Sequence, residues 1–119
     1  MPVKILIIDD SPTANAVMSA SLQEAGFEVE SVLTGKDGVE KGSSGDFGLC
    51  IIDTILPDIN GFEVCRAIRD KSGKAIKIIV MTGSIDAIDA VKARKSGADD
   101  YCVKTKDMEV LVGTVKKLI

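Results

Sequence analysis

The chain contains no histidine and only three cysteines, so two common sources of metal and redox sites are scarce. Without histidine, any metal site must rely largely on oxygen ligands, which suit Mg²⁺ better than zinc. Cys50, Cys65 and Cys102 all lie in apolar segments and show no paired spacing. An odd count without such spacing predicts reduced, packed thiols in a reducing compartment.

Long apolar runs and clusters of basic residues are also missing. The longest apolar run is far too short to span a membrane, so we expect no membrane partner. A net charge of −3 without a Lys/Arg cluster argues against direct nucleic-acid binding. Residues 1–8 are too short for the core of a signal peptide, which favours a cytoplasmic location. The sequence has no repeat or linker, so we expect one domain over residues 1–119.

Five apolar, strand-like runs alternate with five helix-like segments along the chain. The first helix is expected to begin after Ser11, a favoured N-cap, with Pro12 in its first turn, and to end at Gly26. Strict alternation of strands and helices predicts a parallel sheet with both faces covered. The expected strands are 3–8, 27–32, 47–52, 76–82 and 99–103, and the other helices are 36–42, 62–71, 86–96 and 107–119.

Polar residues follow the strands at one edge of the expected sheet. Asp9 and Asp10 follow the first strand and Asp53 follows the third, while Thr82 ends the fourth and Lys104 follows the fifth. Ligands of open parallel sheets bind beyond the carboxyl ends of the strands. Three neighbouring carboxylates repel one another unless a cation lies between them, so the pattern predicts a Mg²⁺ site.

This set of side chains suits phosphoryl transfer. An aspartate beside Mg²⁺ and a lysine can act as a nucleophile towards phosphorus and form an acyl phosphate. The metal and the lysine would neutralise charge on the phosphoryl oxygens, and the hydroxyl of Thr82 could donate a hydrogen bond to one of them.

The motifs resemble those of response-regulator receiver domains of two-component signalling, including the chemotaxis regulators. The resemblance covers the whole chain and implies an α/β, flavodoxin-like, doubly wound five-stranded parallel sheet of order 2-1-3-4-5 with five helices. It rests on Asp9-Asp10, on the segment DTILPDING at 53–61, on Thr82-Gly83-Ser84 and on GADDYCVK at 97–104.

By this resemblance, Asp53 accepts a phosphoryl group from a phosphohistidine on a sensor histidine kinase or phosphotransfer protein. The implied ligands of Mg²⁺ are Asp10 directly, Asp9 mainly through water, Asp53 and the backbone carbonyl of Ile55. Such a chain is a signalling receiver, not a metabolic enzyme, although it catalyses its own phosphorylation and slow dephosphorylation.

The resemblance also implies a conformational switch. Thr82 and Lys104 contact the phosphoryl oxygens, and Tyr101 is the aromatic residue that follows Thr82 inward on activation. A downstream protein is expected to read the face built from the fourth helix, fifth strand and fifth helix. Candidate apolar contacts on this face are Ile85, Ile88 and Val110.

Two loops invite specific expectations. Thr105 follows Lys104 where the family usually has proline, and we expect the Lys104–Thr105 bond to be cis in order to aim the lysine. Asn60-Gly61 suits a tight bend with positive φ.

Three other functions compete with a phosphoacceptor. A haloacid-dehalogenase-like phosphohydrolase needs a general acid two residues beyond its nucleophile, where this chain has Ile55. A flavodoxin-type FMN binder needs a phosphate loop rich in glycine, serine and threonine after the first strand, where Asp9 and Asp10 stand. A degenerate receiver that serves only for interaction would lack site residues that are all present here.

Overall fold

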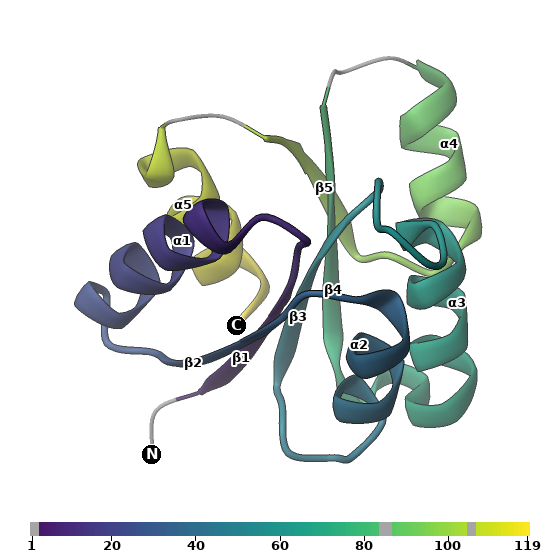
Figure 1. Cartoon of the computed structure of the whole chain (residues 1–119), viewed down its shortest axis with the longest axis horizontal. Coiled ribbons are helices and arrows are strands. Elements are labelled where there is room, and N and C mark those ends of the chain that lie inside the picture. The colour runs from purple at the N-terminus through teal and green to yellow at the C-terminus, as the bar shows by residue number, and fades with distance from the viewer. Residues whose placement is uncertain (1–2, 84–86, 105–106) are drawn as a thin grey trace.

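The computed structural model describes residues 3–83, 87–104 and 107–119, with only the backbone described for residues 87–90. Its centre is a sheet of five parallel strands in the order β2-β1-β3-β4-β5 (Figure 1). This is the predicted topology, and the strands are β1 (Lys4–Ile8), β2 (Glu28–Val32), β3 (Leu49–Asp53), β4 (Lys77–Thr82) and β5 (Asp100–Val103).

Helices cover both faces of the sheet, as the alternating pattern predicts. Figure 1 shows α1 and α5 on one face and α2, α3 and α4 on the other. The helices are α1 (Pro12–Glu24), α2 (Gly35–Gly42), α3 (Gly61–Ser72), α4 (Ala87–Lys95) and α5 (Met108–Leu118), and a short 3₁₀ turn, η1 (Gly73–Ala75), follows α3.

The side chains of the central strands point alternately to the two faces of the sheet, where they form two separate hydrophobic cores. Ile5 and Ile7 of β1 pack with Met18, Leu22 and other residues under α1 and α5. Leu6 and Ile8 of β1, which point to the other face of the sheet, pack under α2, α3 and α4. All five residues of β3 are buried, because this central strand is covered from both sides.

The N-terminus of α1 forms as the sequence predicts. The hydroxyl of Ser11 accepts a hydrogen bond from the backbone N–H of Ala14 at 3.2 Å. Pro12 occupies the first turn, where its missing N–H costs nothing. Gly26 has a φ of 101°, which accounts for the end of the helix at this glycine.

The expected bend with positive φ at Asn60-Gly61 is wrong. Asn60 is instead the N-cap of α3, and its Oδ1 accepts a hydrogen bond from the N–H of Glu63 at 3.0 Å. Gly61 is the first residue of the helix and has no positive φ. A Cβ atom at Gly61 would overlap the carbonyl oxygen of Asp53, so this glycine is needed for close packing rather than for a turn.

Glycine also allows α2 to pack closely against the sheet. A Cβ atom at Gly38 would overlap the side chain of Ile8, so this helix lies directly on β1. The Asp58 carboxylate accepts hydrogen bonds from the backbone N–H groups of Gly35 and Lys36 at 2.8 and 2.9 Å. These bonds hold the pKa of Asp58 below its usual range and anchor the loop after β3 to the start of α2.

The cysteines are free and buried, as the sequence predicts. Burial raises the pKa of the Cys102 thiol to about 11, so this sulfur is a packing group and a poor nucleophile. Within the part of the chain that is described, no helix is long and apolar enough to cross a membrane.

Candidate functional site

The three predicted carboxylates meet at the carboxyl edge of the sheet. β1 pairs with β3 so that Ile8 lies beside Ile52, and the residues that follow them are therefore neighbours. Carboxylate oxygens of Asp9, Asp10 and Asp53 all lie within 4.8 Å of one another. Asp9 is fully buried and Asp53 is 6% exposed, whereas Asp10 faces solvent.

Lys104 reaches this cluster from the end of β5. Its Nζ donates a hydrogen bond to Asp53 Oδ2 at 3.1 Å and lies 2.8 Å from Asp9 Oδ2. Burial lowers the pKa of Lys104, but the contacts with Asp9 and Asp53 outweigh burial and hold the pKa above its usual value. The lysine is therefore charged at neutral pH and offsets part of the repulsion between the carboxylates.

Both carboxylate oxygens of Asp53 accept a hydrogen bond, which fixes the orientation of the group. Oδ1 accepts a hydrogen bond from the backbone N–H of Ile55 at 3.3 Å, while Oδ2 faces Lys104. Burial raises the pKa of Asp53, assisted by the charge of Asp9, and the two hydrogen bonds oppose this shift. A carboxylate with reduced hydration and a fixed orientation is well prepared to act as a nucleophile.

The cluster fits a divalent metal ion. Its donors are hard carboxylate oxygens from three residues, which is the donor set that Mg²⁺ prefers. Asp9 Oδ2 is buried, and the Nζ of Lys104, 2.8 Å away, is the cation that faces it within the described part of the chain. A metal cation between Asp9, Asp10 and Asp53 would relieve the repulsion that remains among the three carboxylates.

The predicted switch residues lie near this edge on the last two strands. Thr82 ends β4 and is 1% exposed, and its carbonyl accepts a hydrogen bond from the N–H of Lys104 at 2.7 Å. Tyr101 lies beside Val80 in the β4–β5 pairing. Tyr101 is partly buried and packs against the core under α3 and α4, which also contains Val80.

Sequence reasoning missed Asn15. This side chain is 4% exposed, and its Nδ2 donates a hydrogen bond to the backbone carbonyl of Asp9 at 2.9 Å. The bond ties α1 to the turn that carries the carboxylates. The only signal in the sequence is a polar residue between Ala14 and Val17 on the apolar side of the predicted helix, and it does not reveal the partner.

Some predicted positions cannot be placed. Thr105 lies outside the described residues, and so does the expected cis bond between Lys104 and Thr105. The side chains of Ile85 and Ile88 lie outside them as well. Val110 of α5 is described and is 50% exposed, as the prediction requires.

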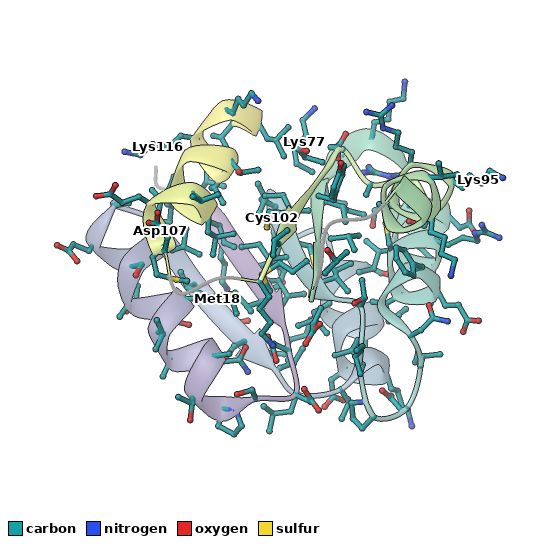
Figure 2. All side chains as sticks on the ribbon, turned by 90° about the horizontal axis from the view of Figure 1, so that it is seen from above. Met18, Lys77, Lys95, Cys102, Asp107 and Lys116 are labelled. Atoms are coloured by element: carbon teal, nitrogen blue, oxygen red, sulfur yellow. The ribbon has the colours of Figure 1, made fainter. Side chains whose placement is uncertain are left out.

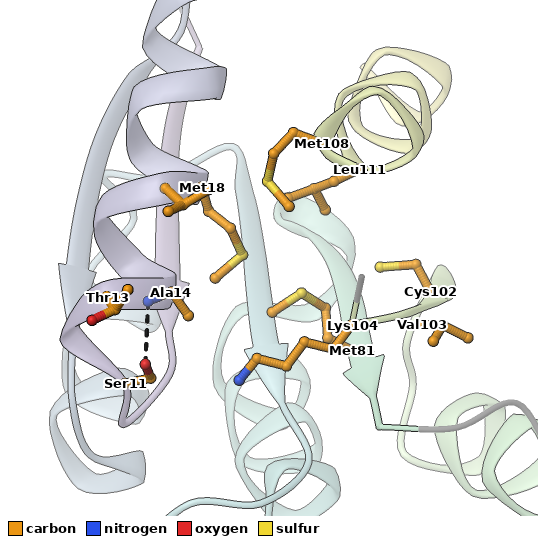
Figure 3. A pocket seen from close by; sticks show the side chains of 11 residues that line it. Ser11, Thr13, Ala14, Met18, Met81, Cys102, Val103, Lys104, Met108 and Leu111 are labelled. Carbon is orange, nitrogen blue, oxygen red and sulfur yellow. Dashed lines mark hydrogen bonds between the residues drawn. The ribbon is translucent and has the colours of Figure 1, made fainter. Parts of the chain in front are cut away.

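An apolar groove opens beside the cluster. It lies between α1 and α5 and has a volume of about 520 Å³. Figure 3 shows Met18, Met81 and Met108 around it, with Ser11 and Lys104 at the end away from Met108. Lys104 is the lining residue that also contacts Asp9 and Asp53. The groove therefore leads from the surface of α1 to the site.

Comparison with known proteins identifies related sequences. The profile of the response regulator receiver domain matches residues 5–116. Response regulator ArlR of Staphylococcus saprophyticus is 35% identical over 116 residues, which are 98% of this chain and 52% of that protein. ArlR of Staphylococcus aureus is 34% identical over 116 residues, again 98% of this chain and 52% of that protein. The chain thus spans about half the length of these curated relatives.

Solved structures with the same architecture cover the whole chain. Chemotaxis protein CheY4 of Vibrio cholerae superposes with a TM-score of 0.93 at 28% identity, over 100% of both chains. Response regulator TrrA of Thermotoga maritima, in complex with Mg²⁺ and BeF, gives 0.89 at 34% identity over 100% of both chains. The BeF3-activated DrrB receiver domain gives 0.88 at 31% identity, over 99% of this chain and 97% of that chain.

Proposed function

Because the chain belongs to the response regulator receiver domain family, we propose that Asp53 accepts a phosphoryl group from a phosphohistidine of a sensor kinase or phosphotransfer protein. The observation that carries this proposal is the position of Asp53 at the end of the central strand, with Asp9, Asp10 and Lys104 around it. The buried, reduced thiols are in keeping with a cytoplasmic location.

In the proposed reaction, a carboxylate oxygen of Asp53 attacks phosphorus as the bond from phosphorus to the histidine nitrogen breaks. The nitrogen keeps the bonding electron pair, and Asp53 becomes an acyl phosphate. Lys104 transfers its contact from Asp53 to a phosphoryl oxygen, and Thr82 donates to another. When bound by Asp9, Asp10, Asp53 and the Ile55 carbonyl, Mg²⁺ supplies further neutralisation of phosphoryl charge.

Phosphorylation by acetyl phosphate tests this proposal directly. With Mg²⁺ present, intact mass spectrometry should show the gain of one phosphoryl group, and a chelator should prevent it. Asp53→Asn should abolish the gain. Asp46→Asn is the matched control, because Asp46 is also an aspartate but is exposed and outside the cluster. Incorporation that persists in Asp53→Asn would refute the assignment of the acceptor.

We further propose that the protein carrying the phosphohistidine contacts the groove between α1 and α5. This proposal is supported by the position of the groove next to the site, since Lys104 lines the groove and also contacts Asp53. Val17, which is 47% exposed, lines the same groove. Val17→Asp should therefore slow transfer from a phosphohistidine protein while leaving phosphorylation by acetyl phosphate unchanged. Equal slowing with both donors would contradict a docking role.

The aspartyl phosphate should hydrolyse slowly because of Ile55. This side chain follows Asp53 by two residues, is 76% exposed, and offers an attacking water no hydrogen bond. Ile55→Asn is expected to shorten the lifetime of the phosphorylated protein severalfold, measured by the loss of the phosphorylated mass after the donor is removed. Ile55→Val should keep the long lifetime. A lifetime of Ile55→Asn equal to that of the wild type would show that Ile55 is not the shield.

Phosphorylation should bury Tyr101 and alter the face formed by α4, β5 and α5. The phosphoryl group adds charge and acceptor oxygens near Thr82, and inward movement of Thr82 leaves space for the ring. Val110 of α5 is 50% exposed, and so is Val91 of α4, so both helices carry an exposed apolar side chain that a downstream protein could contact. Both conformations are expected to pre-exist, so phosphorylation supplies only their energy difference.

Beryllofluoride with Mg²⁺, which mimics the acyl phosphate, tests this switch. The NMR signals of Tyr101 should shift when the mimic binds. Thr82→Ala should still bind the mimic but leave Tyr101 unmoved. An unchanged Tyr101 in the wild type, with the mimic bound at Asp53, would rule out the mechanism.

A further inference from the structure

A second groove lies between α3 and α4, on the face of the sheet opposite α1 and α5. It has a volume of about 320 Å³. Phe62 and Arg66 line it from α3, and Lys92 and Lys95 line it from α4. Figure 2 shows Lys95 at the side of the molecule remote from Lys116 of α5. The groove is thus distinct from the groove beside Lys104, and none of the residues that line it belongs to the carboxylate cluster.

The charge of this groove contrasts with that of the whole chain. Arg66, Lys92 and Lys95 are all exposed, and Glu63 is the single acidic residue among those that line the groove. The salt bridges of the described residues involve Lys4, Lys41, Arg69 and Lys104 as cations, so none of them neutralises these three side chains. A chain of net charge −3 therefore carries three cations here, with Glu63 as the acidic residue among those that line the groove.

The groove also offers an apolar contact. Phe62 is partly buried and packs against the core under α3 and α4. It also lines the groove together with the three cations. Cations around an aromatic surface suit a ligand that is acidic and carries an apolar side chain.

Protein fits these features better than nucleic acid or a free anion. Binding to nucleic acid depends on the neutralisation of many backbone phosphates by Lys and Arg, whereas this groove presents three cations on a negatively charged protein. A single small anion would gain little from side chains that are all exposed to water. An extended or helical peptide can engage the separate cations and Phe62 at once.

We propose that the α3–α4 groove binds an acidic segment of a partner protein, with an aromatic or aliphatic side chain of that segment placed on Phe62. The surface differs from the α4–β5–α5 face, because it lies on the side of α4 that faces α3. Its binding is a property of the unphosphorylated protein, so its test is independent of the acceptor role of Asp53.

The probe is a short, terminally blocked peptide of aspartate and glutamate with one central phenylalanine, titrated into ¹⁵N-labelled protein. We expect saturable shifts of backbone amides in the first half of α3 and the last half of α4. The combined variant Arg66→Glu, Lys92→Glu should weaken binding by roughly tenfold or more, because two contacts change from attraction to repulsion. Replacing the peptide phenylalanine by serine should also weaken binding.

The matched control is the combined variant Lys116→Glu, Lys117→Glu, which makes the same change of charge on exposed positions of α5. It should bind the peptide as the wild type does, and unchanged spectra away from the substitutions confirm that both variants fold. Equal weakening by both variants would show a nonspecific charge effect and overturn the proposal. Absence of saturable shifts, or tighter binding of a single-stranded oligonucleotide than of the peptide, would overturn it too.

Discussion

Gly61→Ala is expected to destabilise the fold by about 3 kcal/mol, at the upper end of the effect of overpacking. The added Cβ would overlap the carbonyl oxygen of Asp53 and lie 2.8 Å from the Cα of Thr54. These are backbone atoms and cannot rotate away, so the start of α3 must move from the end of β3. Thermal unfolding should show a decrease in Tm of about 10 °C.

The displacement should also impair the site, because the atoms that must move belong to Asp53 and its neighbour. Gly113→Ala is the matched control, since Gly113 lies in α5 with no atom within 4 Å of an added Cβ. Alanine there should stabilise the protein by about 0.5–1 kcal/mol through its higher helix propensity. A Gly61→Ala variant as stable as the wild type would show that α3 is not held against β3 in this way.

Lys104→Met is expected to lower the free energy of unfolding by about 2 kcal/mol when Mg²⁺ is absent. Methionine keeps much of the aliphatic stem but removes the cation that faces Asp9 and Asp53. Two buried carboxylates then lack their partner. The expected loss is below that of a fully buried ion pair because Lys104 is 36% exposed.

Urea unfolding in a chelator measures this loss, and Mg²⁺ should recover part of it by binding the folded state. Since burial already raises the pKa of Asp53, the destabilisation should shrink as the pH falls and this carboxylate takes up a proton. Asp10→Asn should act in the opposite direction, stabilising the metal-free protein by about 1 kcal/mol through reduced repulsion. A Lys104→Met variant that is as stable as the wild type in chelator would contradict the proposed balance of charges.

The layout of the sheet and the position of the candidate site could be predicted from the sequence. Strands such as 47–52 are continuous apolar runs, which is the pattern of a strand buried on both faces. Strict alternation with helices then leaves few topologies, and in all of them the residues after the strands share one edge. That is why Asp9, Asp10, Asp53 and Lys104 could be grouped before their distances were known.

Other features were decided by contacts between residues that are distant in sequence. The pairing of Asp58 with the start of α2 joins positions 23 residues apart, and no local pattern marks it. The groove between α3 and α4 exists only because both helices pack on the same face of the sheet.

The sequence alone determined the alternation of strands and helices, the caps of α1 and the set of side chains at the sheet edge, because hydrophobic periodicity and capping are local properties. Only the tertiary structure shows why residue 61 must be glycine and which atom accepts the hydrogen bond of Asn15. Gly61 looked like a turn residue, yet its constraint is the backbone of Asp53, which only packing brings within reach. Asn15 looked like an ordinary helical residue, and its bond to Asp9 depends on how α1 docks on β1. Such constraints arise from the juxtaposition of separate elements, which local patterns of residues do not encode.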